Sequence, residues 1–108
     1  MSTATDFISE LVRAANEVEL LTDREKRRLL ERSVTAILDM RETIGIPPSK
    51  TTADAVIDLQ ATEFRIMRGT ASTEEVRAAL LTAAGMIRDL HIIIDTKLDI
   101  ILNGSQGE

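Results

Sequence analysis

The stretch STEEVRAALLTAAGMIRDLHIIIDTKLDIILNG, residues 72–104, decides the fold. It opens with a capping box, because the Ser72 hydroxyl can accept from the amide of Glu75 while the Glu75 carboxylate reaches back to the amide of Ser72. It ends at Asn103 and Gly104, residues typical of helix C-termini. The isoleucine clusters at 92–94 and 100–102 would also suit short buried strands. Because no turn residue interrupts the segment, we expect one long helix.

This helix is too long for a compact chain of 108 residues. At ~1.5 Å per residue it would extend about 45 Å, whereas a compact domain of this size has a diameter near ~34 Å. The end of the helix should therefore extend past the rest of its own domain.

The second half of the helix is apolar over an arc of roughly 200°. Apolar residues from Val76 to Ile94 also recur at steps of four and three, the spacing of a coiled-coil seam. A second chain around a twofold axis is the simplest cover for this arc, so we expect a homodimer. The predicted dimer interface consists of Ile87, Leu90, Ile93, Ile94, Lys97, Leu98 and Ile101.

Two alternatives to the homodimer stay open. In the first, the chain is a monomeric helical bundle whose last helix breaks or bends at Gly85. In the second, the apolar arc is covered by a different protein.

Three shorter helices precede the long one. The first is expected from about Thr5 to Leu21, with Thr5 or Thr3 as its cap. The second begins at a Thr22–Glu25 capping box and ends at Gly45, before two prolines at 47 and 48. The third begins near Thr51 or Thr52 and ends at Gly69. Its expected apolar face combines Ala53, Val56, Ile57, Phe64 and Met67, with Leu59 and Ile66 beside them.

The expected fold is all-α: four helices in a helical bundle with a long C-terminal helix. We assign residues 1–104 to a single helical domain and residues 105–108 to a disordered tail. The chain has no cysteine, no signal-like N-terminal segment and no apolar run near the ~20 residues of a membrane span, so we expect a cytoplasmic protein without membrane contact. Its net charge of −5 and its two aromatic residues weigh against nucleic-acid binding.

Arg24, Arg28 and Arg32 follow one another at four-residue steps, so they form one row along the second helix. We call them the arginine row. Like charges at this spacing destabilise an isolated helix, and an anionic partner would relieve the repulsion. The ordinary interpretation is a solvated face on which the neighbouring Asp23, Glu25, Glu31 and Asp39 neutralise the arginines.

Arg41 and Lys97 each lie within the apolar arc of their helix. A buried charge must be paired, and Asp58, Glu63 or a carboxylate of a partner chain could satisfy either residue. Alternatively, both side chains lie near an end of the core and extend to water.

No catalytic, cofactor-binding or metal-binding residue can be assigned. His91 and Asp95 are one turn apart, a spacing that suits a metal, but there is no second histidine and no cysteine. Asp95 and Asp99 lie on a polar helix face, and the stretch Pro48–Thr52 lacks the glycines of a phosphate loop. We expect a protein that is not an enzyme and needs no cofactor.

The sequence therefore favours a regulatory protein, adaptor, anti-activator or subunit that binds itself and another protein. The arginine row is the predicted partner-binding site, and an acidic protein surface is the predicted partner. The alternative is a DNA-binding transcriptional regulator that presents the arginine row to phosphates.

Overall fold

The protein is all-helical, as the sequence predicts. A computed structural model describes residues 3–45 and 50–106, and for residues 3, 50–54 and 97–106 it describes the backbone alone. The elements are four helices and one short 3-10 turn: α1 (Thr3–Asn16), η1 (Val18–Leu20), α2 (Asp23–Ile44), α3 (Lys50–Met67) and α4 (Thr73–Gln106). The described residues contain no strand, so the isoleucine clusters at 92–94 and 100–102 are helical.

The ends of α2 confirm the local signals of the sequence. The Thr22 hydroxyl accepts from the Glu25 amide at 3.1 Å, and the Glu25 carboxylate accepts from the Thr22 amide at 3.0 Å. Gly45 ends the helix with a φ of 75° and donates its amide to the carbonyls of Arg41 and Glu42. This left-handed conformation costs glycine little, which explains the residue type at this end. Pro47 and Pro48 lie outside the described residues.

The start of α4 is capped by half of the predicted box. The Glu75 amide donates to the Ser72 hydroxyl at 3.1 Å. The Glu75 carboxylate accepts from the Ser72 hydroxyl at 3.4 Å and from Arg65 Nε of α3 at 2.7 Å. The contact ties the end of α3 to the start of α4, and Gly69, with a φ of 75°, makes the turn between them.

The first helix is shorter than expected. It starts at Thr3, which places Thr5 in its first turn, and it ends at Asn16 rather than Leu21. The chain then tightens into η1, whose Val18 is fully buried.

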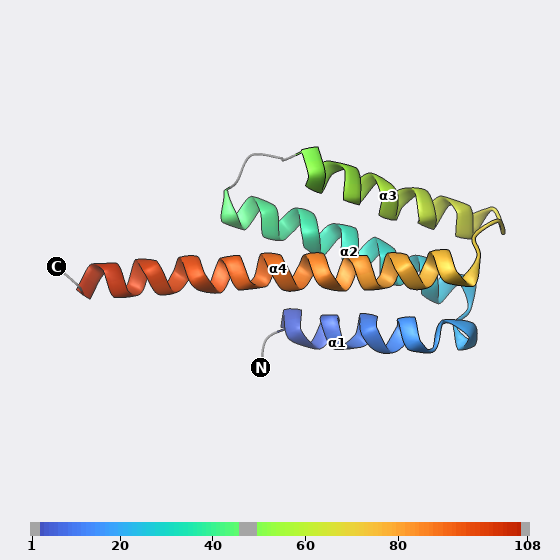
Figure 1. The fold of residues 1–108 in the computed structure, drawn as a ribbon, viewed down its shortest axis with the longest axis horizontal. Helices are drawn as coiled ribbons and strands as arrows, with labels where there is room; N and C mark the ends of the chain where they lie inside the picture. The colour runs from blue at the N-terminus through green and yellow to red at the C-terminus, as the bar shows by residue number, and fades with distance from the viewer. Residues whose placement is uncertain (1–2, 46–49, 107–108) are drawn as a thin grey trace.

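The core lies where α4 meets the other helices. In Figure 1, α4 runs across the molecule with α1 along one side and α2 and α3 along the other. Its contacts with α1 and α2 are the most extensive, while α3 packs mainly on α2. The largest fully buried side chains are Leu11, Leu30, Ile37, Leu59, Leu80 and Ile87. Every helix therefore contributes to one core.

The expected apolar face of α3 was wrong for three of its residues. The structure buries Val56, Leu59 and Ile66, and it leaves Ile57, Phe64 and Met67 each more than half exposed. The buried face also holds Thr62, whose hydroxyl donates to the Asp58 carbonyl at 3.1 Å. Because this hydrogen bond satisfies the hydroxyl, a polar residue can lie on the inner face. Ala53 belongs to the residues whose side chains are not described.

The long last helix extends past the rest of the chain, as predicted. It runs for 34 residues without a break at Gly85 and exceeds the 22 residues of α2 by 12, which corresponds to about 18 Å. Figure 1 shows its C-terminal end beyond all other helices. The radius of gyration, 15.6 Å, accordingly exceeds the ~13 Å of a compact domain of this size. We call residues 95–106 the C-terminal arm.

Two further expectations from the sequence differ from the observed α4. The alternative in which it breaks at Gly85 is wrong for the described chain. Residues 105 and 106, assigned to a disordered tail, are helical, and residues 107 and 108 lie outside the described part.

Candidate functional site

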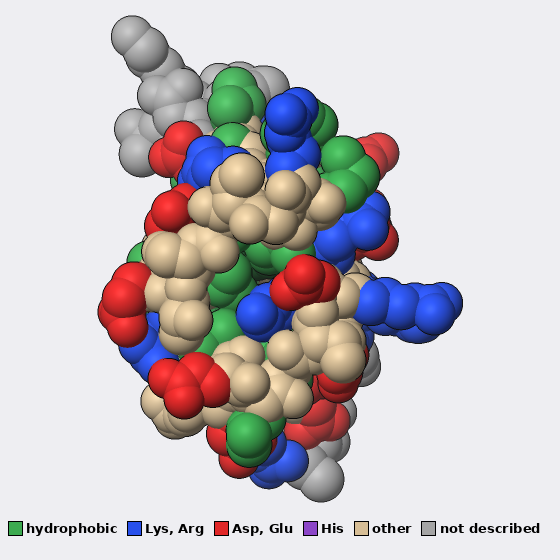
Figure 2. All heavy atoms as spheres, turned by 90° about the vertical axis from the view of Figure 1, so that its right-hand side faces the viewer, with side chains coloured by type: hydrophobic (Ala, Val, Ile, Leu, Met, Phe, Trp, Pro, Cys, Tyr) green, Lys and Arg blue, Asp and Glu red, His purple; other side chains and the backbone are tan. Residues whose placement is uncertain are grey.

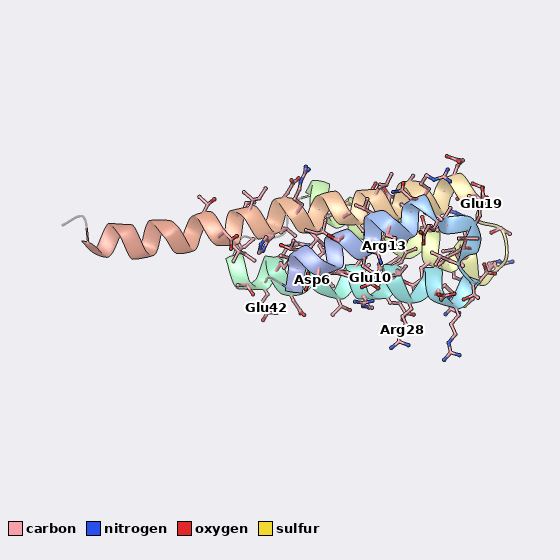
Figure 3. All side chains as sticks on the ribbon, turned by 90° about the horizontal axis from the view of Figure 1, so that it is seen from below. Asp6, Glu10, Arg13, Glu19, Arg28 and Glu42 are labelled. Atoms are coloured by element: carbon pink, nitrogen blue, oxygen red, sulfur yellow. The ribbon has the colours of Figure 1, made fainter. Side chains whose placement is uncertain are left out.

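The arginine row lies on the outer face of α2. This helix turns Leu30, Val34 and Ile37 into the core, which places Arg24 and Arg28 on the opposite, exposed side. Figure 3 labels Arg28, whose side chain points away from the neighbouring helices. Within the described part of the chain, neither Arg24 nor Arg28 has an ion pair or a hydrogen bond from its guanidinium group.

Arg32 behaves differently from the other two. Its guanidinium group donates from both terminal nitrogens to the Glu10 carboxylate of α1, at 2.9 and 3.3 Å. It also lies 4.4 Å from the centre of the Phe7 ring. Such a bidentate pair stacked on an aromatic ring orients both partners. Arg32 therefore connects α1 to α2 and is not free for another partner.

Two of the four carboxylates expected to neutralise the row are engaged elsewhere. Asp23 pairs with Lys26 at 3.6 Å, and Glu25 caps α2, where its hydrogen bond from the Thr22 amide lowers its pKa. The carboxylate that does neutralise an arginine of the row is Glu10, which the sequence analysis missed. A contact between residues 22 positions apart leaves no local signal. Arg24 and Arg28 thus have no ion pair among the described residues, although Glu31 and Asp39 line the same groove.

A groove of about 880 Å³ runs beside the arginine row, between α1 and α2. Its walls include the whole row together with Glu31 and Asp39, and α4 contributes Ile87. Its apolar part is lined by Ala4, Phe7, Ala36, Met40 and Ile87. The groove exists because α1 and α2 both pack on α4 and contact each other little. It combines apolar lining with a positively charged edge, which suits an acidic amphipathic segment.

A second group of charges lies between α2 and α3. Burial raises the pKa of the Glu63 carboxyl above its ordinary value of 4.5, and the nearby Glu31 carboxyl raises it further, while Arg27 opposes both effects. The Arg27 Nε is buried and has no hydrogen-bond partner within the described residues. A shallow pocket of about 280 Å³ borders this group on the side of Phe64 and Met67.

The structure tests the prediction for Arg41 but not the prediction for Lys97, the two charged residues within apolar arcs. Arg41 is half-buried, and within the described part of the chain it pairs with neither Asp58 nor Glu63. This matches the alternative in which its charged end extends to water. The side chain of Lys97 lies outside the described residues, so both interpretations of that position stay predictions.

The predicted dimer interface spans buried and exposed positions. Ile87 is 1% exposed and belongs to the core of its own chain. Leu90 and Ile94 are half-buried, and Ile93 is 40% exposed. The side chains of Lys97, Leu98 and Ile101 lie outside the described residues. The sequence analysis did not include Ile92, which is 53% exposed.

His91 and Asp95 form the pair that their spacing predicts, with 3.3 Å between Nε2 and Oδ2. Among the described residues, no third side chain that could bind a metal is grouped with them.

Charges of both signs are distributed over the molecule. Figure 2 shows the end at which α1 leads into α2 and α3 into α4, where acidic and basic side chains alternate around the surface. No described helix combines the length and the apolar character that crossing a bilayer would require. Comparisons of the chain with protein-family models, with characterised proteins and with solved structures gave no match.

Proposed function

We propose that the chain is a cytosolic helical homodimer that acts by binding another protein. The observation that carries the proposal is the C-terminal arm, which extends about 18 Å beyond the length of α2. Ile93, next to the arm, is 40% exposed. A helix that extends apolar residues beyond its own core is stabilised when a second copy covers them.

The partner-binding surface in this proposal is the free part of the arginine row. Arg24 and Arg28 are exposed, one turn apart and without ion pairs among the described residues, so they favour an acidic protein surface. Arg32 is assigned a different role, since Glu10 and Phe7 hold it in place.

Two measurements test the two parts of the proposal. Light scattering at working concentration should give twice the monomer mass of 11.9 kDa, and a monomer would overturn the dimer. Capture from a native lysate should then lose a partner when Arg24 and Arg28 are both changed to alanine.

A matched control for the capture experiment removes the same charge elsewhere. Arg13 and Arg88 are also exposed arginines, but they lie outside the arginine row. The Arg13→Ala, Arg88→Ala variant should keep the partner. Equal loss with both variants would show an effect of net charge alone and would reject the row as the binding surface.

DNA binding is the second candidate, because two exposed arginines without ion pairs can also contact phosphates. Affinity in a gel shift should then fall steeply as salt rises. No shift at low salt, or a shift insensitive to salt, would reject this function. The protein's net charge of −5 favours the protein-binding alternative.

A further inference from the structure

The groove beside the arginine row opens toward the end of the molecule from which the C-terminal arm extends. Ala4 and Phe7 lie in the first turns of α1, and Ala36 and Met40 lie in the second half of α2. Ile87 of α4 forms part of the lining between them. All five residues therefore lie close to the level at which α4 leaves the rest of the chain.

The lining of the groove would accept a helix. The Ala4 and Ala36 side chains are small, so a helix backbone can approach closely there. Phe7 and Ile87 form the buried apolar floor of the groove, and Met40 adds half-buried apolar surface beside it. Arg28, farther from the arm along α2, is exposed and has no ion pair among the described residues. The occupant should be an apolar helix that carries a carboxylate.

The chain itself contains such a segment. In the sequence, Leu98 and Ile101 follow Ile94 at steps of four and three residues, although the strict alternation that joins Ile87, Leu90 and Ile94 would next reach Lys97. After Lys97, the remaining charged side chains are Asp99 and Glu108, both acidic. Because α4 is one unbroken helix to Gln106, the apolar spacing continues into the arm.

The arm and the groove also agree in length. The arm is about 18 Å long, and the helical rise from Met40 back to Arg28 along α2 is likewise about 18 Å. If two copies meet around a twofold axis that crosses α4 at a right angle near the start of the arm, their α4 helices run antiparallel and each arm points toward the groove of the other copy.

We propose that the groove between α1 and α2 receives the C-terminal arm of a second copy, and that the exchange is reciprocal. This inference rests on the proposed homodimer and assigns Arg28 to the arm of the second copy, so that Arg24 remains exposed for another protein. The apolar lining covers the arm of the second copy, and Arg28 supplies a positive charge that suits an acidic arm. In this arrangement, each copy covers the apolar residues of the other copy's arm.

The absence of cysteine from the chain allows a direct test by disulfide crosslinking. Ala36→Cys is made in one version of the full-length chain and Ile101→Cys in a second version with a different tag, and the two are mixed and oxidised. We call these two variants the groove pair. Because a disulfide requires Cα atoms within about 7 Å, a bond between the two tagged chains reports the arm in the groove of another copy. The different tags separate this product from bonds between identical chains.

A control pair uses Leu81→Cys with Ile101→Cys. Leu81 is 46% exposed but does not line the groove. Thiols held together in a complex react at an effective concentration far above that in bulk solution, so the groove pair should give at least on the order of tenfold more mixed dimer than the control pair. Circular dichroism of each single variant verifies that it is folded.

Three outcomes separate this inference from the proposed function. A dimer by light scattering, together with abundant mixed disulfide from the groove pair, supports both. A dimer in which the groove pair crosslinks no better than the control pair overturns the arm exchange and leaves the homodimer in place. A monomer overturns both.

Discussion

Replacing Ile93 by alanine measures how much the exposed part of α4 contributes to dimerisation. The residue is 40% exposed within one chain. Complete burial of an isoleucine side chain stabilises by about 1.5–3 kcal/mol, so covering this fraction contributes about 0.6–1.2 kcal/mol per copy. A twofold interface contains the residue twice, which gives about 1.2–2.4 kcal/mol. Ile93→Ala should therefore raise the dimer dissociation constant by roughly 7- to 50-fold.

Sedimentation equilibrium over a range of concentrations gives the dissociation constant, and Ile92→Ala provides the matched control. Ile92 is the same residue type, lies one position earlier and is more exposed, at 53%, but it points about 100° away around the helix. Its replacement should leave the dissociation constant nearly unchanged. If Ile93→Ala has no effect, or if Ile92→Ala weakens the dimer as much, the predicted interface is wrong.

Three further predictions concern the stability of the single chain, measured by thermal unfolding. Because burial and Glu31 raise the folded-state pKa of Glu63, its ionised form destabilises the fold at neutral pH, so Glu63→Gln should raise Tm there. This gain should vanish as the pH falls below 4.5, and a gain that persists in acid would contradict the cause given. Thr22→Ala removes the capping box with Glu25 and should cost about 1 kcal/mol, or roughly 4–8 °C in Tm; an unchanged Tm would refute the contribution of the cap. Gly45→Ala forces a side chain into left-handed backbone and should cost about 1–2 kcal/mol, whereas equal stability would mean that the turn rearranges.

The helix boundaries could be predicted because their signals are local. The Thr22–Glu25 box and the glycine at 45 act within four residues of the helix ends, and the structure contains both. The continuity of α4 followed from the absence of breakers, since Gly85 alone is a weak one.

The inner face of α3 could not be predicted in this way. Its apolar residues surround much of the helix, and the sequence alone favoured the side with Ile57 and Phe64. The structure buries the side with Leu59 and Thr62, because α3 packs on α2 through that side and the hydroxyl finds a carbonyl within its own helix. Which side of a helix is covered depends on neighbours that the local pattern does not contain.

For the same reason, only part of the candidate site could be predicted from the sequence. Four-residue spacing placed the arginine row on one face of α2. The pair between Arg32 and Glu10, and the groove beside it, depend on how α1 and α2 pack on α4, so no spacing along one helix could reveal them.

The central position of α4 determines when the chain can fold during its synthesis. Of the four described helices, α4 is synthesised last, and α1 and α2 contact each other too little to form a core without it. Isolated helices of 14 and 22 residues are marginal in water, so the first two helices stay unstable while translation continues. Folding can be completed only once the chain through Ile87, the last core residue of α4, has been released. The core of the nascent protein is therefore completed only at this late stage of synthesis.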